Sequence, residues 1–147
     1  MSAQDVAKLR EETGAGLMDA KRALDAAGGD HEKAKQQLIA AGIAKADKKG
    51  DRLAGAAYLE TYIHAGRIGV LLEIHAETDF VTRAEQFREA AKQIAMQIAA
   101  NAPETIEQLL GQPYVRDEAL TVEQYLKSVI AKVGENIKVT RFTRYQI

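Results

Sequence analysis

Residues 68–75 carry the strictest hydrophobic period in the chain, and this period constrains the fold more than any other feature. Large aliphatic side chains occupy every second position, at Ile68, Val70, Leu72 and Ile74. A period of two is typical of a β-strand with one face in a core. Residues 57–64 precede this stretch across the short turn Ala65-Gly66, so the sequence predicts an antiparallel hairpin.

The first strand of this hairpin also divides its side chains between two faces. Leu59 and Ile63 share one face, and Tyr58 and Tyr62 share the other. We expect Tyr58, Tyr62 and Leu71 on the side of the sheet that faces away from the core. Antiparallel sheets can leave such a face in water. Alternatively, the face pairs with its copy in a second chain, and we expect this symmetric homodimer through the core sheet.

Two amphipathic helices are predicted after the hairpin. The first starts at the capping-box pattern formed by Thr82 and Glu85 and ends near residue 100. The second is bounded by Thr121 and Gly134.

A third strand is predicted at residues 137–145, which are rich in β-branched and aromatic side chains. Two amphipathic helices can cover one face of a three-stranded sheet. Residues 55–147 are therefore expected to form an α+β domain, in which helices cover one face of a three-stranded antiparallel sheet.

Three short helices are predicted before the hairpin. Ser2 with Asp5 three residues later is typical of a helix start, and this helix is expected to stop before Gly14. The second helix is expected from about Leu17 to Ala27.

The third helix is predicted to begin after the cap Asp30 and to close at Gly42. Helices of about ten residues are marginal alone, so their apolar stripes are expected to meet. Residues 1–44 are thus predicted to form a three-helix bundle.

Residues 45–54 are expected to form a charged linker. Four basic side chains occur there: Lys45, Lys48, Lys49 and Arg52. An RNA- or ribosome-binding module would use them together with Lys138, Arg141 and Arg144 of the last strand. Asp47 and Asp51 are interspersed among the linker lysines, and such mixed charge is typical of a solvated connection.

The overall charge and the hydropathy exclude two classes of function. Lys and Arg total 20 and Asp and Glu total 21 among 147 residues, for a formal charge of -1, so the excess positive charge of a nonspecific nucleic-acid binder is missing. No run of about 18 apolar residues exists to span a membrane, and the pattern of a signal peptide is missing. We expect a cytoplasmic protein with no membrane partner and no direct nucleic-acid partner.

Motifs of catalysis do not occur in the sequence. It contains no G-x-x-x-x-G-K-[ST] phosphate loop, no H-E-x-x-H zinc motif and no G-x-S-x-G nucleophile motif. His31, His64 and His75 do not have metal-ligand spacing. The carboxylates are dispersed, so no general acid and base can be chosen. We expect a binding protein rather than an enzyme, with no catalytic residue, metal site or cofactor.

The connection between the hairpin and the next helix does not fit a purely structural role. It contains Asp79-Phe80-Val81, although such connections normally use small polar residues. Either Phe80 or Val81 can fold back onto the helix as a hydrophobic staple. In the other arrangement, Phe80 projects outward as an aromatic anchor for a partner. The residues alone leave both arrangements open.

Three stretches of the chain resemble the elongation factor Ts family. They are V-A-K-L-R-E-E-T-G-A-G-L-M-D-A-K-R-A-L at residues 6–24, Y-I-H-A-G-R-I-G-V-L-L-E-I followed by E-T-D-F-V at residues 62–81, and G-Q-P-Y-V followed by I-A-K-V-G-E-N-I at residues 111–137. They occur in the family's order and cover nearly the whole chain.

The resemblance implies a guanine nucleotide exchange factor for elongation factor Tu, the GTPase that delivers aminoacyl-tRNA to the ribosome during translation elongation. It also implies that the N-terminal bundle is similar to ubiquitin-associated domains. Arg10, Leu17, Met18 and Lys21 match bundle positions that touch the GTP-binding domain of the partner.

The resemblance further implies a wedge for the partner's magnesium and phosphate site. Asp79 and Phe80 match the wedge itself, and Thr78 and Val81 match the positions that shape its loop. The magnesium belongs to the partner, so no cofactor or metal is implied for this chain.

Two departures from the family pattern concern length. Only a few residues separate Pro103 from Gly111, where family members carry a longer helical insertion. The chain also stops at Ile147, without the extension that supplies a second sheet in longer members. A short member would find that second sheet in another copy, which strengthens the expectation of a homodimer.

Overall fold

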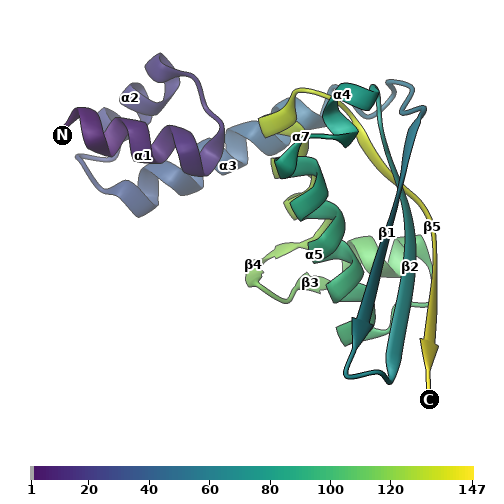
Figure 1. Ribbon diagram of the computed structural model, residues 1–147. Helices are drawn as coiled ribbons and strands as arrows, with labels where there is room; N and C mark the ends of the chain where they lie inside the picture. The colour runs from purple at the N-terminus through teal and green to yellow at the C-terminus, as the bar shows by residue number, and fades with distance from the viewer. Residues whose placement is uncertain (1) are drawn as a thin grey trace.

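The first part of the chain is a bundle of three helices, as predicted. The computed structural model describes residues 2–147. Helices α1 (Ala3–Thr13), α2 (Leu17–Ala26) and α3 (His31–Asp47) pack around Leu9, Leu24 and Ala34 (Figure 1). Ser2 and Asp5 form the predicted capping box on α1, which satisfies amide groups that the helix leaves free.

Helix α3 does not end at Gly42, so that prediction is wrong. It continues to Asp47, and the first residues of the expected linker are helical. Gly42 lies where α3 crosses α7 (Val122–Val133), and a Cβ atom on Gly42 would meet the Ala131 Cβ at 3.0 Å. The glycine therefore permits a close helix crossing here rather than terminating the helix. This crossing brings the bundle against the second part of the chain.

The sheet consists of the predicted hairpin and the predicted last strand. Strands β1 (Ala56–His64), β2 (Ile68–Ala76) and β5 (Ile137–Gln146) run antiparallel in the order β1-β2-β5. Helices α5 (Glu85–Asn101) and α7 lie on one side of this sheet (Figure 1). Val70, Leu72 and Ile74 of the central strand are buried, so the expected α+β architecture is confirmed.

The connection between β1 and β2 is one residue longer than predicted. His64 pairs with Ile68, so residues 65–67 form the turn, whereas the sequence indicated only Ala65-Gly66. Both Ala65 and Gly66 have positive φ angles, of 51° and 66°. Because successive side chains of a strand point to opposite faces, a register shift of one residue exchanges the two faces.

This register shift overturns the prediction for the faces of β1. Tyr58 and Tyr62 lie opposite Ile74 and Val70 and pack against the core. The other side of the sheet carries the exposed apolar side chains, and we call it the open face. Its apolar members are Leu59, Ile63, Leu71 and Tyr145. Of the three residues predicted there, only Leu71 lies on it.

The predicted helix start at Thr82 and Glu85 is also wrong. A short helix, α4 (Asp79–Thr82), stands between β2 and α5. Thr82 is its last residue, and its hydroxyl donates a hydrogen bond to the Asp79 carbonyl at 3.0 Å. As a residue of α4, Thr82 does not occupy the extended position that precedes α5, and so it does not cap that helix. Helix α5 instead begins after Ala84, without a side-chain cap.

Residues for which no element was predicted form a small connection beside the helices. It consists of α6 (Ile106–Gly111), β3 (Pro113–Tyr114) and β4 (Asp117–Thr121). Tyr114 stacks on Tyr125 of α7 with ring centroids 4.1 Å apart, which ties the β3-β4 hairpin to the helix layer. Helix α7 begins with the predicted cap Thr121 and ends at Gly134.

The larger core lies between the sheet and the helices. Phe87, Ile94 and Ile98 of α5 are fully buried against Leu72 and Ile74 of β2. Within residues 2–147, no helix is both long enough and apolar enough to cross a membrane.

Candidate partner-binding site

The candidate site begins where β2 ends and the chain turns into α4. Thr78 has an extended backbone, and its hydroxyl accepts a hydrogen bond from the Val81 N–H at 3.4 Å. The backbone then makes a single helical turn, closed by the Arg83 N–H on the Asp79 carbonyl at 3.2 Å. Asp79, Phe80 and Val81 therefore occupy three successive directions around one turn.

The side chains of this turn divide between the core and the solvent. Val81 is 5 % exposed and belongs to the larger core, whereas Phe80 is 85 % exposed. The two arrangements left open by the sequence are thus distinguished: Val81 folds inward and Phe80 projects outward. Asp79 is exposed beside it. The ring is therefore outside the core and accessible from the solvent, as an aromatic anchor for a partner would need to be.

Contacts from other elements hold the turn at both ends. The Glu135 carboxylate accepts from the Thr78 N–H at 2.9 Å and from the Thr78 hydroxyl at 2.8 Å. At the other end, Arg88 Nε donates to the Thr82 carbonyl at 3.2 Å. One helical turn has almost no stability of its own. These contacts, together with the buried Val81, therefore define its orientation.

The sequence did not indicate Glu135 or its neighbour Asn136 as part of this region. The Asn136 N–H donates to Glu77 Oε2 at 2.7 Å, and its side-chain amide donates to the Gly50 and Arg52 carbonyls at 3.3 and 2.9 Å. The connection between α7 and β5 thus joins the linker to the end of β2. These residues are more than 50 positions apart in sequence, and no local pattern predicts such contacts.

The predicted contact residues of the bundle lie on its surface. Leu17 and Met18 are exposed large apolar side chains in the first turn of α2. Lys21 lies one turn further along α2, and Arg10 is on α1; both are exposed. Figure 1 shows the bundle and α4 toward the same end of the molecule. The two predicted contact regions are therefore able to face one partner.

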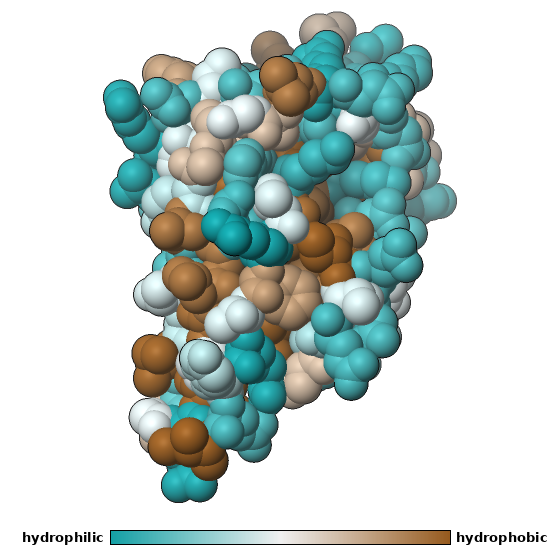
Figure 2. Space-filling model, turned by 90° about the vertical axis from the view of Figure 1, so that its right-hand side faces the viewer, coloured by the Kyte–Doolittle hydropathy of each residue, from teal (hydrophilic) through white to brown (hydrophobic). Residues whose placement is uncertain are grey.

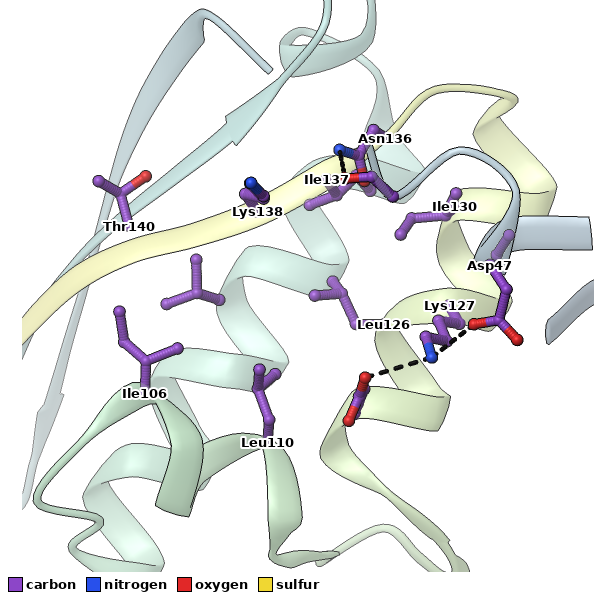
Figure 3. A pocket seen from close by; sticks show the side chains of 14 residues that line it. Asp47, Ile106, Leu110, Leu126, Lys127, Ile130, Asn136, Ile137, Lys138 and Thr140 are labelled. Carbon is purple, nitrogen blue, oxygen red and sulfur yellow. Dashed lines mark hydrogen bonds and ion pairs between the residues drawn. The ribbon is translucent and has the colours of Figure 1, made fainter. Parts of the chain in front are cut away.

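One cavity lies between the helix layer and the last strand. It is an open groove of about 560 Å³ between α6, α7 and β5, and its apolar lining includes Ile106, Leu110 and Leu126 (Figure 3). Lys127 at its rim is bonded to Asp47 at 2.6 Å and Glu123 at 3.2 Å, and the Asp47 hydrogen bond raises the pKa of the Lys127 ammonium. Through Asp47, these partly exposed ion pairs link α3 to α7 at the rim of the groove.

Several ionisable side chains outside this groove form ion pairs. His75 Nε2 lies 2.8 Å from Glu73 Oε2, and Arg141 Nε donates to Glu73 Oε1 at 2.9 Å. The hydrogen bond with His75, followed by that with Arg141, lowers the pKa of the Glu73 carboxyl. In the described part of the chain, no three His, Cys, Asp or Glu side chains gather as metal ligands.

Three of the basic residues considered for RNA are engaged within the chain. Besides Arg141 on Glu73, Arg144 donates to the Ala99 carbonyl at 3.0 Å. Arg52 of the linker lies 3.8 Å from Glu77. These contacts leave fewer free cations for phosphates than the sequence indicates.

Comparison with known proteins gives a consistent result along the chain. The family described as Elongation factor TS matches residues 77–147. An elongation factor Ts of Desulforamulus reducens is 40 % identical over an alignment of 193 positions that covers 100 % of this chain and 89 % of the relative. A chloroplastic elongation factor Ts of Rhodomonas salina is 38 % identical, with 100 % and 89 % covered. One from Nostoc is 45 % identical over 148 positions, which cover 100 % of this chain but 47 % of the relative.

The alignment with one relative is longer than this chain. The 193 aligned positions of the Desulforamulus reducens protein exceed the 147 residues of this chain by 46. The relative therefore has, in total, 46 positions within the aligned region to which this chain has no counterpart, whereas the Nostoc alignment of 148 positions exceeds this chain by one.

Proposed function

This chain belongs to the elongation factor Ts family, and on that basis we propose that it is a guanine nucleotide exchange factor for elongation factor Tu. It acts by wedging the Asp79-Phe80 loop near the partner's magnesium and phosphate site, so that GDP is released during translation elongation. The observation that carries this proposal is the 85 % exposure of Phe80. The turn that bears it is held by Glu135, by Arg88 and by the buried Val81. The chain works as a binding protein and has no catalytic step of its own.

The exchange follows from linked binding equilibria. The chain binds best to the partner conformation that holds GDP and magnesium poorly, and it therefore shifts the partner toward that conformation. GDP weakens the binding of this chain by the same factor by which the chain weakens the binding of GDP. An aromatic ring entering a packed pocket moves a neighbouring element between discrete positions. Phe80 supplies the ring, and Asp79 brings a negative charge toward the site of the partner's cation.

The N-terminal bundle supplies a second contact in this proposal. Leu17 and Met18 present an apolar patch, and Arg10 and Lys21 present positive charge. We assign these four residues to the GTP-binding domain of elongation factor Tu. Because α3 packs across α7, this contact and the wedge are carried by connected elements. The role places the chain in the cytoplasm with its partner.

The proposal is tested by the rate at which labelled GDP leaves elongation factor Tu. A saturating amount of the chain is expected to accelerate release by about tenfold or more, a coupling of the usual size between two binding sites. An unchanged release rate, together with RNA binding that falls steeply with salt, would favour the RNA-binding function instead.

We also propose that two copies of the chain form a homodimer through the open face. Figure 2 shows hydrophobic side chains gathered on this side of the sheet. Leu59 and Leu71 line a shallow hollow of about 300 Å³ there. An exposed apolar patch of this kind is typical of an interaction surface. A symmetric dimer would cover the patch with its own copy.

The dimer predicts a defined response to charge on the open face. In sedimentation equilibrium at tens of micromolar, the unaltered chain is expected to have the dimer mass. Leu71→Arg is expected to have the monomer mass, because a charge in an apolar interface is left unpaired. Val115→Arg is the matched control, since Val115 is 42 % and Leu71 is 45 % exposed. Val115 lies in the turn of the β3-β4 hairpin, on the helix side of the sheet and away from the open face. A monomer mass for the unaltered chain contradicts the dimer.

A further inference from the structure

Glu135 lies outside the Asp79-Phe80 loop but makes two hydrogen bonds to Thr78, the residue that precedes Asp79. One carboxylate oxygen accepts from the Thr78 N–H at 2.9 Å and the other from the Thr78 hydroxyl at 2.8 Å. The same hydroxyl accepts from the Val81 N–H at 3.4 Å. Glu135, Thr78 and Val81 thus form a chain of hydrogen bonds that ends on the backbone beside Phe80.

The position of Glu135 is itself fixed by its neighbours. Gly134 ends α7 in the left-handed conformation, with φ of 79°. Asn136 is 2 % exposed and donates to the Gly50 and Arg52 carbonyls and, through its backbone, to Glu77. Figure 3 shows Asn136 at the start of β5, with its amide bonded to the chain beside it. The backbone on both sides of Glu135 is therefore held in place, which fixes where its carboxylate starts.

The turn that carries Phe80 needs such support. Helix α4 has four residues, and a helix of that length does not form by itself. The Phe80 ring has no place in either core cluster. Without the two bonds to Glu135, the Thr78 side chain keeps its contact with the Val81 N–H, and the Thr78 carbonyl keeps its bond from the Thr82 N–H at 3.3 Å. The ring would then sample several directions, and binding would have to restrict it to one.

We propose that Glu135 is a positioning residue for nucleotide exchange: its carboxylate fixes Thr78 so that Phe80 is presented in one direction. This inference rests on the proposed function, because it acts through the Phe80 wedge. It assigns no contact between Glu135 and the partner.

The test compares five variants in the release of labelled GDP from elongation factor Tu: Glu135→Ala, Glu135→Gln, Phe80→Ala, the double variant of Glu135→Ala with Phe80→Ala, and Glu118→Ala. Glu135→Ala is expected to slow exchange by about fivefold to tenfold, the loss for hydrogen bonds to a partly exposed charged group. Glu135→Gln is expected to stay within about twofold of the unaltered chain, because its amide can accept from the Thr78 N–H and donate to the Thr78 hydroxyl. Adding Glu135→Ala to Phe80→Ala is expected to cause no further loss. Glu118→Ala removes an exposed carboxylate of β4 and is the control.

A second measurement is independent of the partner. Amide hydrogen exchange at Thr78 and Val81 is expected to become about fivefold to tenfold faster in Glu135→Ala and to stay unchanged in Glu118→Ala. If Glu135→Ala does not fold, Thr78→Val takes its place in the GDP-release assay. This variant removes the Thr78 hydroxyl alone and is expected to slow the release of GDP.

The outcomes separate this inference from the proposed function. If Phe80→Ala slows exchange and Glu135→Ala does not, the positioning role is wrong while the wedge stands. If Glu135→Ala slows exchange equally with and without Phe80, Glu135 acts elsewhere and the positioning role is wrong. If Phe80→Ala itself has no effect, the wedge is wrong and the positioning role is lost with it.

Discussion

Phe80→Ala is expected to slow the release of labelled GDP from elongation factor Tu by at least about tenfold, the loss typical of removing an aromatic anchor from an interface. The ring is 85 % exposed on α4, so in the proposed complex its whole area is available to a partner pocket. The backbone turn below it is held by Val81 and Thr78 rather than by the ring. The variant should therefore lose exchange activity without losing its fold.

The measurement combines a kinetic and a structural readout. The circular dichroism spectrum of Phe80→Ala is expected to match that of the unaltered chain. Ile147→Ala is the matched control, since this exposed apolar side chain, 79 % accessible, lies at the far end of the sheet from α4 (Figure 1). The control should exchange at the unaltered rate. A Phe80→Ala variant with unchanged exchange would remove Phe80 from the mechanism.

Phe87→Ala is expected to have the opposite consequence, a large loss of stability. Phe87 is fully buried at the start of α5, and its ring meets that of Tyr58 edge to face with centroids 5.8 Å apart. Replacing a buried phenylalanine by alanine removes about 3–5 kcal/mol through lost burial and the cavity left behind. This is a large part of the roughly 5–15 kcal/mol by which a typical domain is stable.

Urea denaturation followed by circular dichroism measures this loss. The chain has three phenylalanines, and they form a graded series: Phe87 is buried, Phe142 is half-buried and Phe80 is exposed. The destabilisation by alanine is expected to decrease in that order and to be within about 0.5 kcal/mol of zero for Phe80. Equal losses of unfolding free energy in Phe80→Ala and Phe87→Ala would contradict the assignment of Phe87 to the core and of Phe80 to partner binding.

Local patterns in the sequence predicted the elements that depend on neighbouring residues alone. Capping at Ser2, Asp30 and Thr121 needs a side chain and amide groups within one helical turn, and the structure has all three caps. The alternation along residues 68–75 likewise predicted the central strand and its buried face. These features depend on short-range geometry, which a single sequence contains.

Local patterns failed where two local choices were close in energy. Thr78 and Thr82 are both typical cap residues by type, but Thr78 caps α4, whose Val81 packs into the core, and Thr82 ends it. Gly42 is a typical helix end by residue type, but packing against Ala131 keeps α3 helical through it. In both places a contact with another element outweighs a preference of about 1 kcal/mol or less.

Two features on which the proposals rest were decided only by the tertiary structure. The turn at residues 65–67 shifted the β1 register and placed Leu59 and Ile63, rather than the tyrosines, on the open face. Glu135 reaches Thr78 across 57 positions of sequence, a contact that no periodicity contains. The sequence by itself determined the family, the α+β class and the Asp79-Phe80 pair. Register and long-range contacts depend on how distant segments pack, and so only the folded chain determines which face is open and what holds Phe80 in place.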